Sequence, residues 1–224
     1  MKIGTRVLIL AAGSGERWGN YLGVPKHLIQ IDGKTLLQRT VEQFGKYADE
    51  IVVVAPEDHR YDIDGAVKYI PRTNPEREMD KFISSMKLWG DQNVILVYGD
   101  VYFTDEAVET IMSYSGDWKY FCRPWPSDIT GKNCKEIFAI YVPPHNHSFV
   151  KNNINAIADL NTATGGWSLF RQLTLGRHVK GADEDKAMFE AGCHIAIDDF
   201  TEDFDYPRDY VVWRRELEKT RNLR

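Results

Sequence analysis

Cysteine is scarce in this sequence of 224 residues, and the few that occur are far apart. Cys122, Cys134 and Cys193 show no Cys-x-x-Cys spacing. A disulfide framework or a structural zinc site requires thiols in a regular pattern, so neither is expected here. We interpret the three residues as reduced thiols that behave as small hydrophobic side chains.

Long apolar runs and an excess of positive charge are also missing. No run approaches the roughly 18–20 apolar residues of a membrane-spanning helix. The first stretch, "MKIGTRVLILAAGSGER", lacks the apolar core and the cleavage site of a signal peptide. The net charge of −5 at pH 7 provides no general positive field for nucleic acid or a membrane surface. We expect a cytoplasmic protein whose anion-binding sites are local, and the sequence leaves its oligomeric state open.

Apolar, β-branched runs alternate along the chain with segments of helical periodicity. The expected strands lie in residues 5–13, 49–56, 66–72, 93–103, 118–125, 136–143 and 190–200. The expected helices lie in residues 34–48, 76–89, 106–115, 147–161, 168–176 and 206–224. Strands alternating with helices predict a three-layer α/β/α fold around a mostly parallel sheet, with ligands in the crevice at the carboxyl ends of the strands.

The first expected strand runs directly into the small-residue sequence "AAGSG" (residues 11–15). Small side chains leave the backbone N–H groups of such a loop open to a phosphate chain. The spacing fits neither Gly-x-Gly-x-x-Gly nor the P-loop pattern, so these two modes of nucleotide binding are not expected. Arg17 and Lys26 follow the loop, and a forked cation beside a point-like cation suits a triphosphate.

The motif "LAAGSGERWG" followed by "PKHL" resembles that of the nucleotidyltransferases of GT-A-like fold, the sugar-1-phosphate nucleotidyltransferases and their molybdenum-cofactor relatives. The resemblance implies a Rossmann-like α/β/α domain in which the loop backbone holds the base and the phosphates of a nucleotide. It also implies that Arg17 binds the outer phosphates and that Lys26 contacts the α-phosphate.

Nucleotide-binding positions are expected in the loop and in a later segment. The sequence "NPEREMDKFISSM" (residues 74–86) offers Asn74 and Ser84 to the base or the ribose, although Ser84 suits an ordinary polar helix position equally well. The residues that we expect to bind the nucleotide are Leu10, Ala11, Ala12, Gly13, Ser14, Gly15, Arg17, Lys26, Asn74, Ser84 and Gly99.

Two further matches concern carboxylates. In "YGDVYF", Asp100 stands at the carboxyl end of an expected strand, where relatives bind a divalent cation. Near the end of the chain, "DFDYPRDY" resembles the Asp-x-Asp-Thr-Pro-Glu-Asp-Leu element that supplies a second acid to the metal, which points to Asp205. Tyr206 and Arg208 replace the Thr and the Glu of this element, so neighbouring acids are alternative candidates for the second metal ligand. The competing acids are Asp198, Asp199 and Asp203.

The later part of the chain is expected to supply an acceptor site. Our candidates are Arg123, Lys132 and Lys186 for a phosphate, Trp125 and Trp167 for stacking on a ring, Glu136 for a hydroxyl group, and Gly166 in a mobile loop. Residues 145–190 are the least regular stretch and are our candidate for an acceptor-side insert or lid. No repeat or low-complexity linker divides the chain, so we expect residues 1–224 to form one domain.

Together these features favour nucleotidyl transfer, in which Mg²⁺ or Mn²⁺ is held by Asp100 and Asp205 and the catalytic residues are Arg17, Lys26 and Asp100. The partners would be a nucleoside triphosphate and a phosphorylated small molecule, most simply a sugar-1-phosphate. Two alternatives stay open: a GT-A-type glycosyltransferase that uses a nucleotide-sugar, and a non-catalytic nucleotide-binding regulatory protein. Val101 and Tyr102 follow Asp100, so the strand end lacks the Asp-x-Asp pair common in glycosyltransferases.

Overall fold

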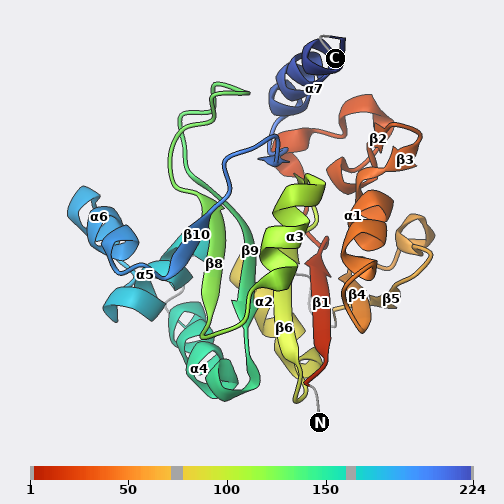
Figure 1. Cartoon of the computed structure of the whole chain (residues 1–224). Helices are drawn as coiled ribbons and strands as arrows, with labels where there is room; N and C mark the ends of the chain where they lie inside the picture. The colour runs from red at the N-terminus through yellow and green to blue at the C-terminus, as the bar shows by residue number, and fades with distance from the viewer. Residues whose placement is uncertain (1–2, 72–77, 160–164, 223–224) are drawn as a thin grey trace.

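A seven-stranded sheet forms the centre of the molecule (Figure 1). The computed structural model describes residues 3–71, 78–159 and 165–222, and the strand order of the sheet is β10-β8-β9-β6-β1-β4-β5. Its strands are β1 Thr5–Leu10, β4 Glu50–Val54, β5 Val67–Tyr69, β6 Asn93–Tyr98, β8 Lys119–Arg123, β9 Glu136–Val142 and β10 His194–Ala196. β9 runs antiparallel to β6 and β8, and the other neighbouring strands are parallel. The prediction of a mostly parallel sheet is confirmed.

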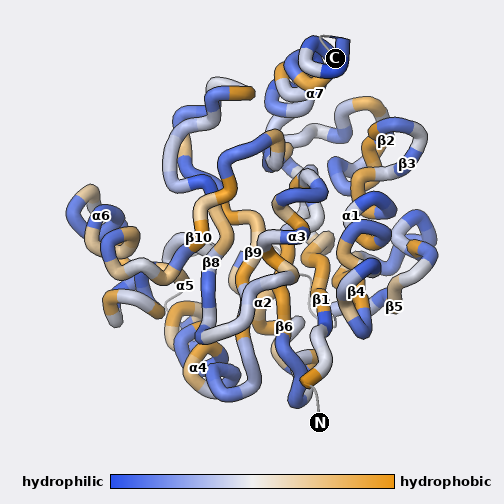
Figure 2. Tube along the Cα trace, viewed as in Figure 1, coloured by the Kyte–Doolittle hydropathy of each residue, from blue (hydrophilic) through white to orange (hydrophobic). Residues whose placement is uncertain are grey.

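Helices cover both faces of the sheet and complete the three layers. They are α1 Leu36–Gly45, α2 Glu78–Ser85, α3 Asp105–Ser113, α4 His147–Ala158, α5 Gly166–Leu175, α6 Ala182–Glu190 and α7 Pro207–Asn222. Phe44 of α1 and Ile111 of α3 pack on one face, and Phe82 of α2 and Phe170 of α5 pack on the other. Figure 2 shows that hydrophobic residues concentrate in the central strands and that polar residues occupy much of the surrounding helices.

Threonine side chains define where two of these helices begin. The Oγ1 atom of Thr35 accepts a hydrogen bond from the N–H of Gln38 at 3.1 Å, at the start of α1. The Oγ1 atom of Thr104 accepts one from the N–H of Ala107 at 3.0 Å, at the start of α3. Each cap satisfies a backbone donor that has no partner inside its helix, and it directs the chain from a loop onto the sheet.

The stretch expected as one strand over residues 93–103 is broken in the structure. β6 ends at Tyr98, and a Cβ atom on Gly99 would lie 2.9 Å from the Cβ of Ala11 and 3.0 Å from the carbonyl oxygen of Leu10. Only glycine therefore fits this close beside the end of β1. Beyond the break, β7 Val101–Tyr102 leaves the main sheet and pairs with β11 Glu202–Asp203.

Where the structure describes residues 145–190, they form helices that pack on the sheet. Val150 of α4, Leu169 and Phe170 of α5, and Met188 of α6 are buried in the cluster that covers one face of the sheet. This stretch is therefore part of the helical layer, because its apolar side chains pack on the sheet. α6 was not expected from the sequence, since its apolar periodicity is weak and Met188 is its one buried residue.

A third apolar cluster lies beneath α7, at the upper end of the molecule in Figure 1. The small β2–β3 hairpin, Gln30–Ile31 and Lys34–Thr35, contributes to it. Trp213 of α7 is fully buried, and the centre of its ring lies 4.4 Å from that of Tyr102 and 5.1 Å from that of Phe204. Because these rings flank β7 and β11, the cluster holds the two short strands together.

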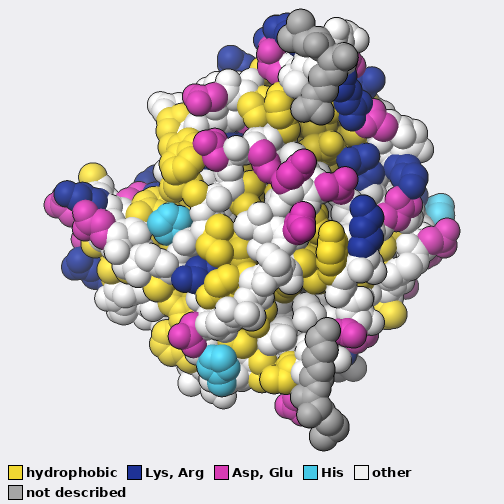
Figure 3. Space-filling view, in the orientation of Figure 1, with side chains coloured by type: hydrophobic (Ala, Val, Ile, Leu, Met, Phe, Trp, Pro, Cys, Tyr) yellow, Lys and Arg dark blue, Asp and Glu magenta, His cyan; other side chains and the backbone are white. Residues whose placement is uncertain are grey.

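The surface in Figure 3 carries both signs of charge. Acidic side chains gather over α3, and Lys and Arg side chains lie over α1 and α7 on the same face. This mixture agrees with the net charge of −5 and gives no broad basic surface in this view. None of the helices in the described ranges is long and apolar enough to cross a membrane.

We expect Trp213→Ala to lower the free energy of unfolding by about 3–5 kcal/mol, because deleting a buried indole leaves a cavity beneath α7. Urea denaturation followed by circular dichroism measures this change. Val211→Ala is the matched control, since Val211 lies on the same helix and is 48% exposed. The control should change the free energy of unfolding by no more than about 0.5 kcal/mol. Equal stabilities of the two variants would contradict the packing of α7.

Candidate active site

A cavity of about 590 Å³ opens at the carboxyl ends of β1 and β6. The last residues of these strands, Leu10 and Tyr98, form part of its wall. Six carboxylates and four Lys or Arg side chains also line it. Ligands of open α/β sheets bind at this edge, so the cavity lies where the sequence predicted a ligand site.

The glycine-rich loop forms one side of the cavity through residues 13–15. The N–H of Ala11 donates to the carbonyl oxygen of Val54 at 2.8 Å, which ties the start of the loop to β4. Gly15 has a φ of +66°, a left-handed conformation that favours glycine. Trp18 then buries its side chain in the cluster beneath α7. Both ends of the loop are anchored, and its backbone borders the cavity with few side-chain atoms.

Two cationic side chains reach from this loop region to the same carboxylates. Lys26 is only 8% exposed, its ammonium contacts Asp100, and its Nζ lies 3.5 Å from Oδ1 of Asp205. The Nη2 atom of Arg17 lies 2.6 Å from that same Oδ1 atom. The Arg17 side chain is 58% exposed, so it can turn toward a ligand at little cost, whereas Lys26 is held in place by its surroundings.

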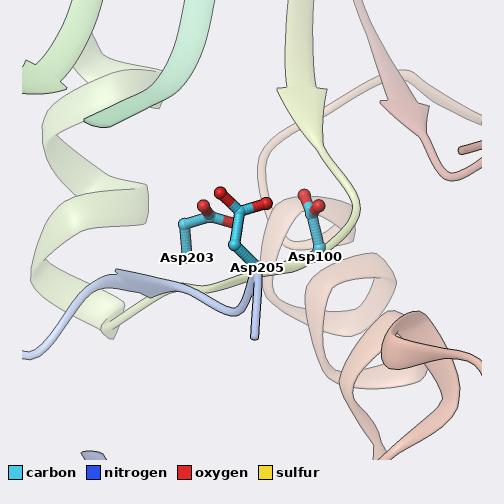
Figure 4. Close-up of side chains that lie close together, drawn as sticks. All are labelled: Asp100, Asp203 and Asp205. Carbon is cyan, nitrogen blue, oxygen red and sulfur yellow. The ribbon is translucent and has the colours of Figure 1, made fainter. Parts of the chain in front are cut away.

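Asp100, Asp203 and Asp205 form a compact group of carboxylates (Figure 4). One oxygen of each lies within 4.8 Å of one oxygen of each of the others. The pairing of β11 with β7 explains how they meet, because it places Asp203 opposite Val101. The N–H of Phe204 also donates to the carbonyl oxygen of Asp100 at 3.1 Å. Residues a hundred positions apart in sequence thus share one small volume.

The structure distinguishes the acids that were alternative candidates for the second metal ligand. Asp203 joins Asp100 and Asp205 in the carboxylate group. Asp199 instead accepts hydrogen bonds from the hydroxyl of Thr104 at 2.6 Å and from the N–H of Thr201 at 2.7 Å, so it stabilises the start of α3. Asp198 is exposed and lies outside the cavity wall.

Burial and charge act in opposite directions on the pKa values of this site. Burial alone would lower the pKa of Lys26, but Asp100 and the other carboxylates raise it above its ordinary value. Burial alone would raise the pKa of Asp100, but Lys26 and other positive neighbours hold it below its ordinary value. For Asp203, burial and repulsion by Asp100 both raise the pKa. A further cation beside Asp203 would oppose this rise and favour its ionised form.

Lys132 approaches the carboxylates from the connection between β8 and β9. Its Nζ atom lies 2.8 Å from Glu136, 3.1 Å from Asp203 and 3.6 Å from Asp209. Burial alone would lower the pKa of Lys132, but Asp203 and Glu136 raise it. Lys132 is not part of the cavity wall, so it contacts the carboxylates on the side away from the cavity and leaves the cavity open.

The group of three carboxylates consists only of oxygen ligands. Hard divalent cations such as Mg²⁺ prefer these ligands, and they commonly take one or two carboxylates together with phosphate oxygens and water. Zinc sites, by contrast, usually contain His or Cys. The residues present therefore fit Mg²⁺ or Mn²⁺.

Most of the residues predicted from the sequence lie at this cavity. Those in its wall are Leu10, Gly13, Ser14, Gly15, Arg17, Lys26, Asp100, Glu136, Trp167 and Asp205. Ala11 and Ala12 continue from β1, and Gly99 follows β6, without reaching the wall. Gly166 adjoins Trp167 at the start of α5. Asn74 and most of the loop before Gly166 lie outside the described residues.

Further predicted residues, Lys132 and Trp125 among them, are not brought to the cavity. The hydroxyl of Ser84 donates to a carbonyl oxygen within α2 at 2.9 Å. The Lys186 side chain is 75% exposed, and its Nζ lies 3.8 Å from Glu190 on the same helix. Arg123 is 3% exposed, and its guanidinium donates to both oxygens of Glu202 at 3.1 and 2.9 Å. Arg123 therefore has a buried partner in place of an acceptor phosphate.

The cavity wall also contains charged residues that sequence reasoning did not identify. Glu78 and Lys81 line it from α2, and Lys135 lines it from the position just before β9. The Oε1 atom of Glu78 accepts hydrogen bonds from the hydroxyl of Tyr98 at 2.5 Å and from the N–H of Gly166 at 2.9 Å. The three-residue spacing of Glu78 and Lys81 places them on one helix face, but solvated helix faces show the same pattern.

A mostly parallel sheet, a glycine-rich loop after its first strand, and cations facing a carboxylate group together define a nucleotide-binding α/β domain. Comparison with known families makes this more specific. The family described as the MobA-like NTP transferase domain matches residues 7–179, and the chain belongs to this family. The resemblance seen in the opening motif is confirmed.

Two curated proteins are similar to parts of the chain. A bifunctional IspD/IspF enzyme of Clavibacter michiganensis is 46% identical over 55 residues, which cover 24% of this chain and 13% of that protein. A bifunctional IPC transferase and DIPP synthase of Archaeoglobus fulgidus is 27% identical over 118 residues, which cover 50% of this chain and 23% of that protein. The matched parts span less than a quarter of the length of either relative.

Solved structures share the fold over nearly the whole chain. A putative glucose-1-phosphate thymidylyltransferase of Bacillus anthracis superposes with a TM-score of 0.60 at 12% identity and covers 97% of this chain and 95% of its own. A CTP:phosphocholine cytidylyltransferase of Streptococcus pneumoniae superposes with a TM-score of 0.59 at 13% identity and covers 97% and 99%. At this level of identity the comparison shows the fold, which agrees with the predicted GT-A-like architecture.

We expect Arg123→Met to lower the free energy of unfolding by about 3–5 kcal/mol, because it leaves the carboxylate of Glu202 buried without its cation. Urea denaturation measures the loss. Arg215→Met is the control, because the side chain of Arg215 is 64% exposed, and it should stay within about 0.5 kcal/mol of the wild type. An Arg123→Met variant of unchanged stability would contradict the stabilising ion pair with Glu202. It would favour the earlier expectation that Arg123 binds an acceptor phosphate.

Proposed function

We propose that this protein is a Mg²⁺-dependent nucleotidyltransferase that transfers a nucleoside monophosphate from a triphosphate to a phosphorylated small molecule, most simply a sugar-1-phosphate. One observation carries the proposal. Arg17 and Lys26 from the glycine-rich loop region meet Asp100, Asp203 and Asp205 at one cavity. Membership of the MobA-like NTP transferase family supports the same reaction class.

The chemistry explains why such a site needs both signs of charge. A phosphate oxygen of the acceptor forms a bond to the α-phosphorus, the bond from that phosphorus to the bridging oxygen breaks, and pyrophosphate leaves with that oxygen. Both reactants are anions, so the protein mainly has to align them and neutralise their charge. No covalent intermediate with the protein is required.

The two cationic side chains would neutralise different phosphates of the nucleoside triphosphate. Lys26 is buried and fixed by Asp100, so it suits the α-phosphate, where geometry matters most. Arg17 is more exposed, and its forked guanidinium suits the outer phosphates that leave as pyrophosphate. The backbone of residues 13–15 would supply N–H donors to the same phosphate chain.

A divalent cation completes the charge balance in this proposal. Asp100, Asp203 and Asp205 would hold it through oxygen atoms that already lie within 4.8 Å of one another. When bound, Mg²⁺ neutralises phosphate charge and polarises the phosphoryl group that is attacked. Burial and repulsion by Asp100 raise the pKa of Asp203 although Lys132 lies beside it, and a bound cation would oppose this rise.

The acceptor would bind on the side of the cavity formed by β9 and α5. Glu136 and Trp167 lie there and offer an oxygen acceptor and an aromatic face. Two of the proteins with this fold are named for phosphorylated acceptors, glucose-1-phosphate and phosphocholine. A phosphorylated small molecule with hydroxyl or ammonium groups is therefore the acceptor class to test.

Pyrophosphate release tests this function directly. The four common nucleoside triphosphates are each combined with phosphorylated sugars, polyols and choline in the presence of Mg²⁺, and at least one combination should release pyrophosphate. Lys26→Met should then lower kcat by about 100-fold or more and change the nucleotide KM less, because Lys26 acts on charge that develops in the transition state.

Lys46→Met is the control for this assay. Lys46 follows α1 and its side chain is 58% exposed, outside the cavity wall. Its kcat and KM should match those of the wild type. Turnover of nucleotide-sugars without pyrophosphate release from any triphosphate would favour the glycosyltransferase instead. Nucleotide binding without any turnover would favour the regulatory protein.

The carboxylate group is tested by metal binding itself. Asp100→Asn should weaken binding of Mn²⁺, followed by electron paramagnetic resonance, by about tenfold or more, because it removes one charged oxygen ligand. Asp117→Asn is the control, because Asp117 is 79% exposed and pairs with His145. Equal Mn²⁺ affinity of the Asp100→Asn variant and the wild type would remove Asp100 from the metal site.

A further inference from the structure

Lys81 crosses from α2 to the glycine-rich loop. A Cβ atom built on Gly13 would lie 2.9 Å from the Nζ of Lys81 and 3.5 Å from its Cε. The ammonium group therefore rests against the Cα of Gly13, in the space that a larger residue would fill. Both residues lie in the cavity wall, and Lys81 is half-buried. Its charge is thus held at the loop and not extended into solvent.

Lys81 differs in its partners from the other cations of the cavity. Arg17 pairs with Asp205, Lys26 with Asp100, and Lys135 with Asp185. Lys81 forms no ion pair with any residue that the structure describes. Asp100 interacts with its charge at longer range, and a partly desolvated ammonium without a carboxylate at ion-pair distance favours an anion beside it.

We propose that Lys81 binds the phosphate chain of the nucleoside triphosphate where that chain passes Gly13. This inference rests on the proposed function and adds a phosphate-binding residue from a helix far from the opening motif. Residues 13–15 of the loop and Lys81 line the same cavity, so one phosphate group there could accept hydrogen bonds from loop N–H groups and from the ammonium.

The position of Lys81 also explains the need for glycine at residue 13. A methyl group there would push the ammonium away from the loop, because the two would stand 2.9 Å apart. The Lys81 side chain is flexible and would yield, so the protein should still fold. Gly13→Ala should therefore weaken phosphate binding in part by displacing Lys81, and this part should vanish in the Lys81→Met background.

Lys87 provides a matched control a short distance along the chain. It lies in the 3-10 helix Met86–Leu88 directly after α2. Its Nζ lies 4.5 Å from the centre of the Tyr69 ring, and it is absent from the cavity wall. Lys87→Met removes the same charge from the same part of the fold without touching the glycine-rich loop.

Inorganic tripolyphosphate is the probe, because it carries the phosphate chain without a base. Isothermal titration calorimetry in the presence of Mg²⁺ compares the wild type with Lys81→Met, Lys81→Arg and Lys87→Met. Lys81→Met should weaken binding by about tenfold or more, the loss expected for one charge-assisted hydrogen bond. Lys81→Arg should keep most of the affinity, and Lys87→Met should stay within about twofold of the wild type. Circular dichroism verifies that each variant is folded.

A second arm distinguishes the donor phosphates from an acceptor phosphate. In the pyrophosphate assay, Lys81→Met should raise the KM of the triphosphate about tenfold and leave the KM of the acceptor within about twofold. A rise in the acceptor KM alone would overturn the assignment to the donor. Wild-type affinity of Lys81→Met for tripolyphosphate, or no binding of tripolyphosphate to the wild type, would overturn the inference altogether.

The calorimetric result does not depend on the proposed reaction. If no triphosphate and acceptor turn over but Lys81→Met weakens tripolyphosphate binding, the phosphate site stands and the proposed reaction fails. If Arg17→Met weakens tripolyphosphate binding and Lys81→Met does not, the role of Lys81 fails and the proposed reaction stands.

Discussion

Attraction between Lys26 and the carboxylates of Asp100 and Asp205 joins the two halves of this site. Three carboxylates whose oxygens lie within 4.8 Å repel one another, and their partial burial adds a cost of desolvation. Lys26 and Arg17 offset this cost from the loop side, and Lys132 offsets it from the β8–β9 connection. A polyphosphate with a divalent cation presents the same two signs of charge. In the proposed function, such a ligand would replace internal ion pairs of the site with contacts of the same sign.

The apolar cluster beneath α7 holds the carboxylates of the site in place. Trp213 packs against Tyr102 and Phe204, which follow Asp100 and Asp203 along β7 and β11. A second support comes from Glu202, whose buried carboxylate accepts hydrogen bonds from Arg123, Ser127 and Thr130. Rigid packing on both sides limits how far the carboxylates can move apart. Repulsion within the group is thus opposed by contacts that do not involve the ligand.

Much of the fold and part of the site follow from local sequence. Strands such as β1 and β4 are continuous apolar runs, and α1 has its apolar residues at helical spacing, so each could be recognised without knowledge of its neighbours. The loop after β1 is equally local, because its glycines and the two cations follow one another within 14 residues, from Gly13 to Lys26. Residues 145–190 were harder to interpret, since the packing of α4 to α6 on the sheet leaves only a weak periodic pattern.

The sequence by itself determined the α/β/α class, the strand-end position of the site, and the roles open to Arg17, Lys26 and Asp100, because these depend on residue type and on neighbours along the chain. Only the tertiary structure decided that Asp203 joins the carboxylate group, that Arg123 pairs with the buried Glu202, and that Lys81 reaches Gly13. Each of these depends on a contact between residues at least 68 positions apart. Such contacts are set by strand pairing and side-chain packing, which a linear pattern of charged residues does not encode.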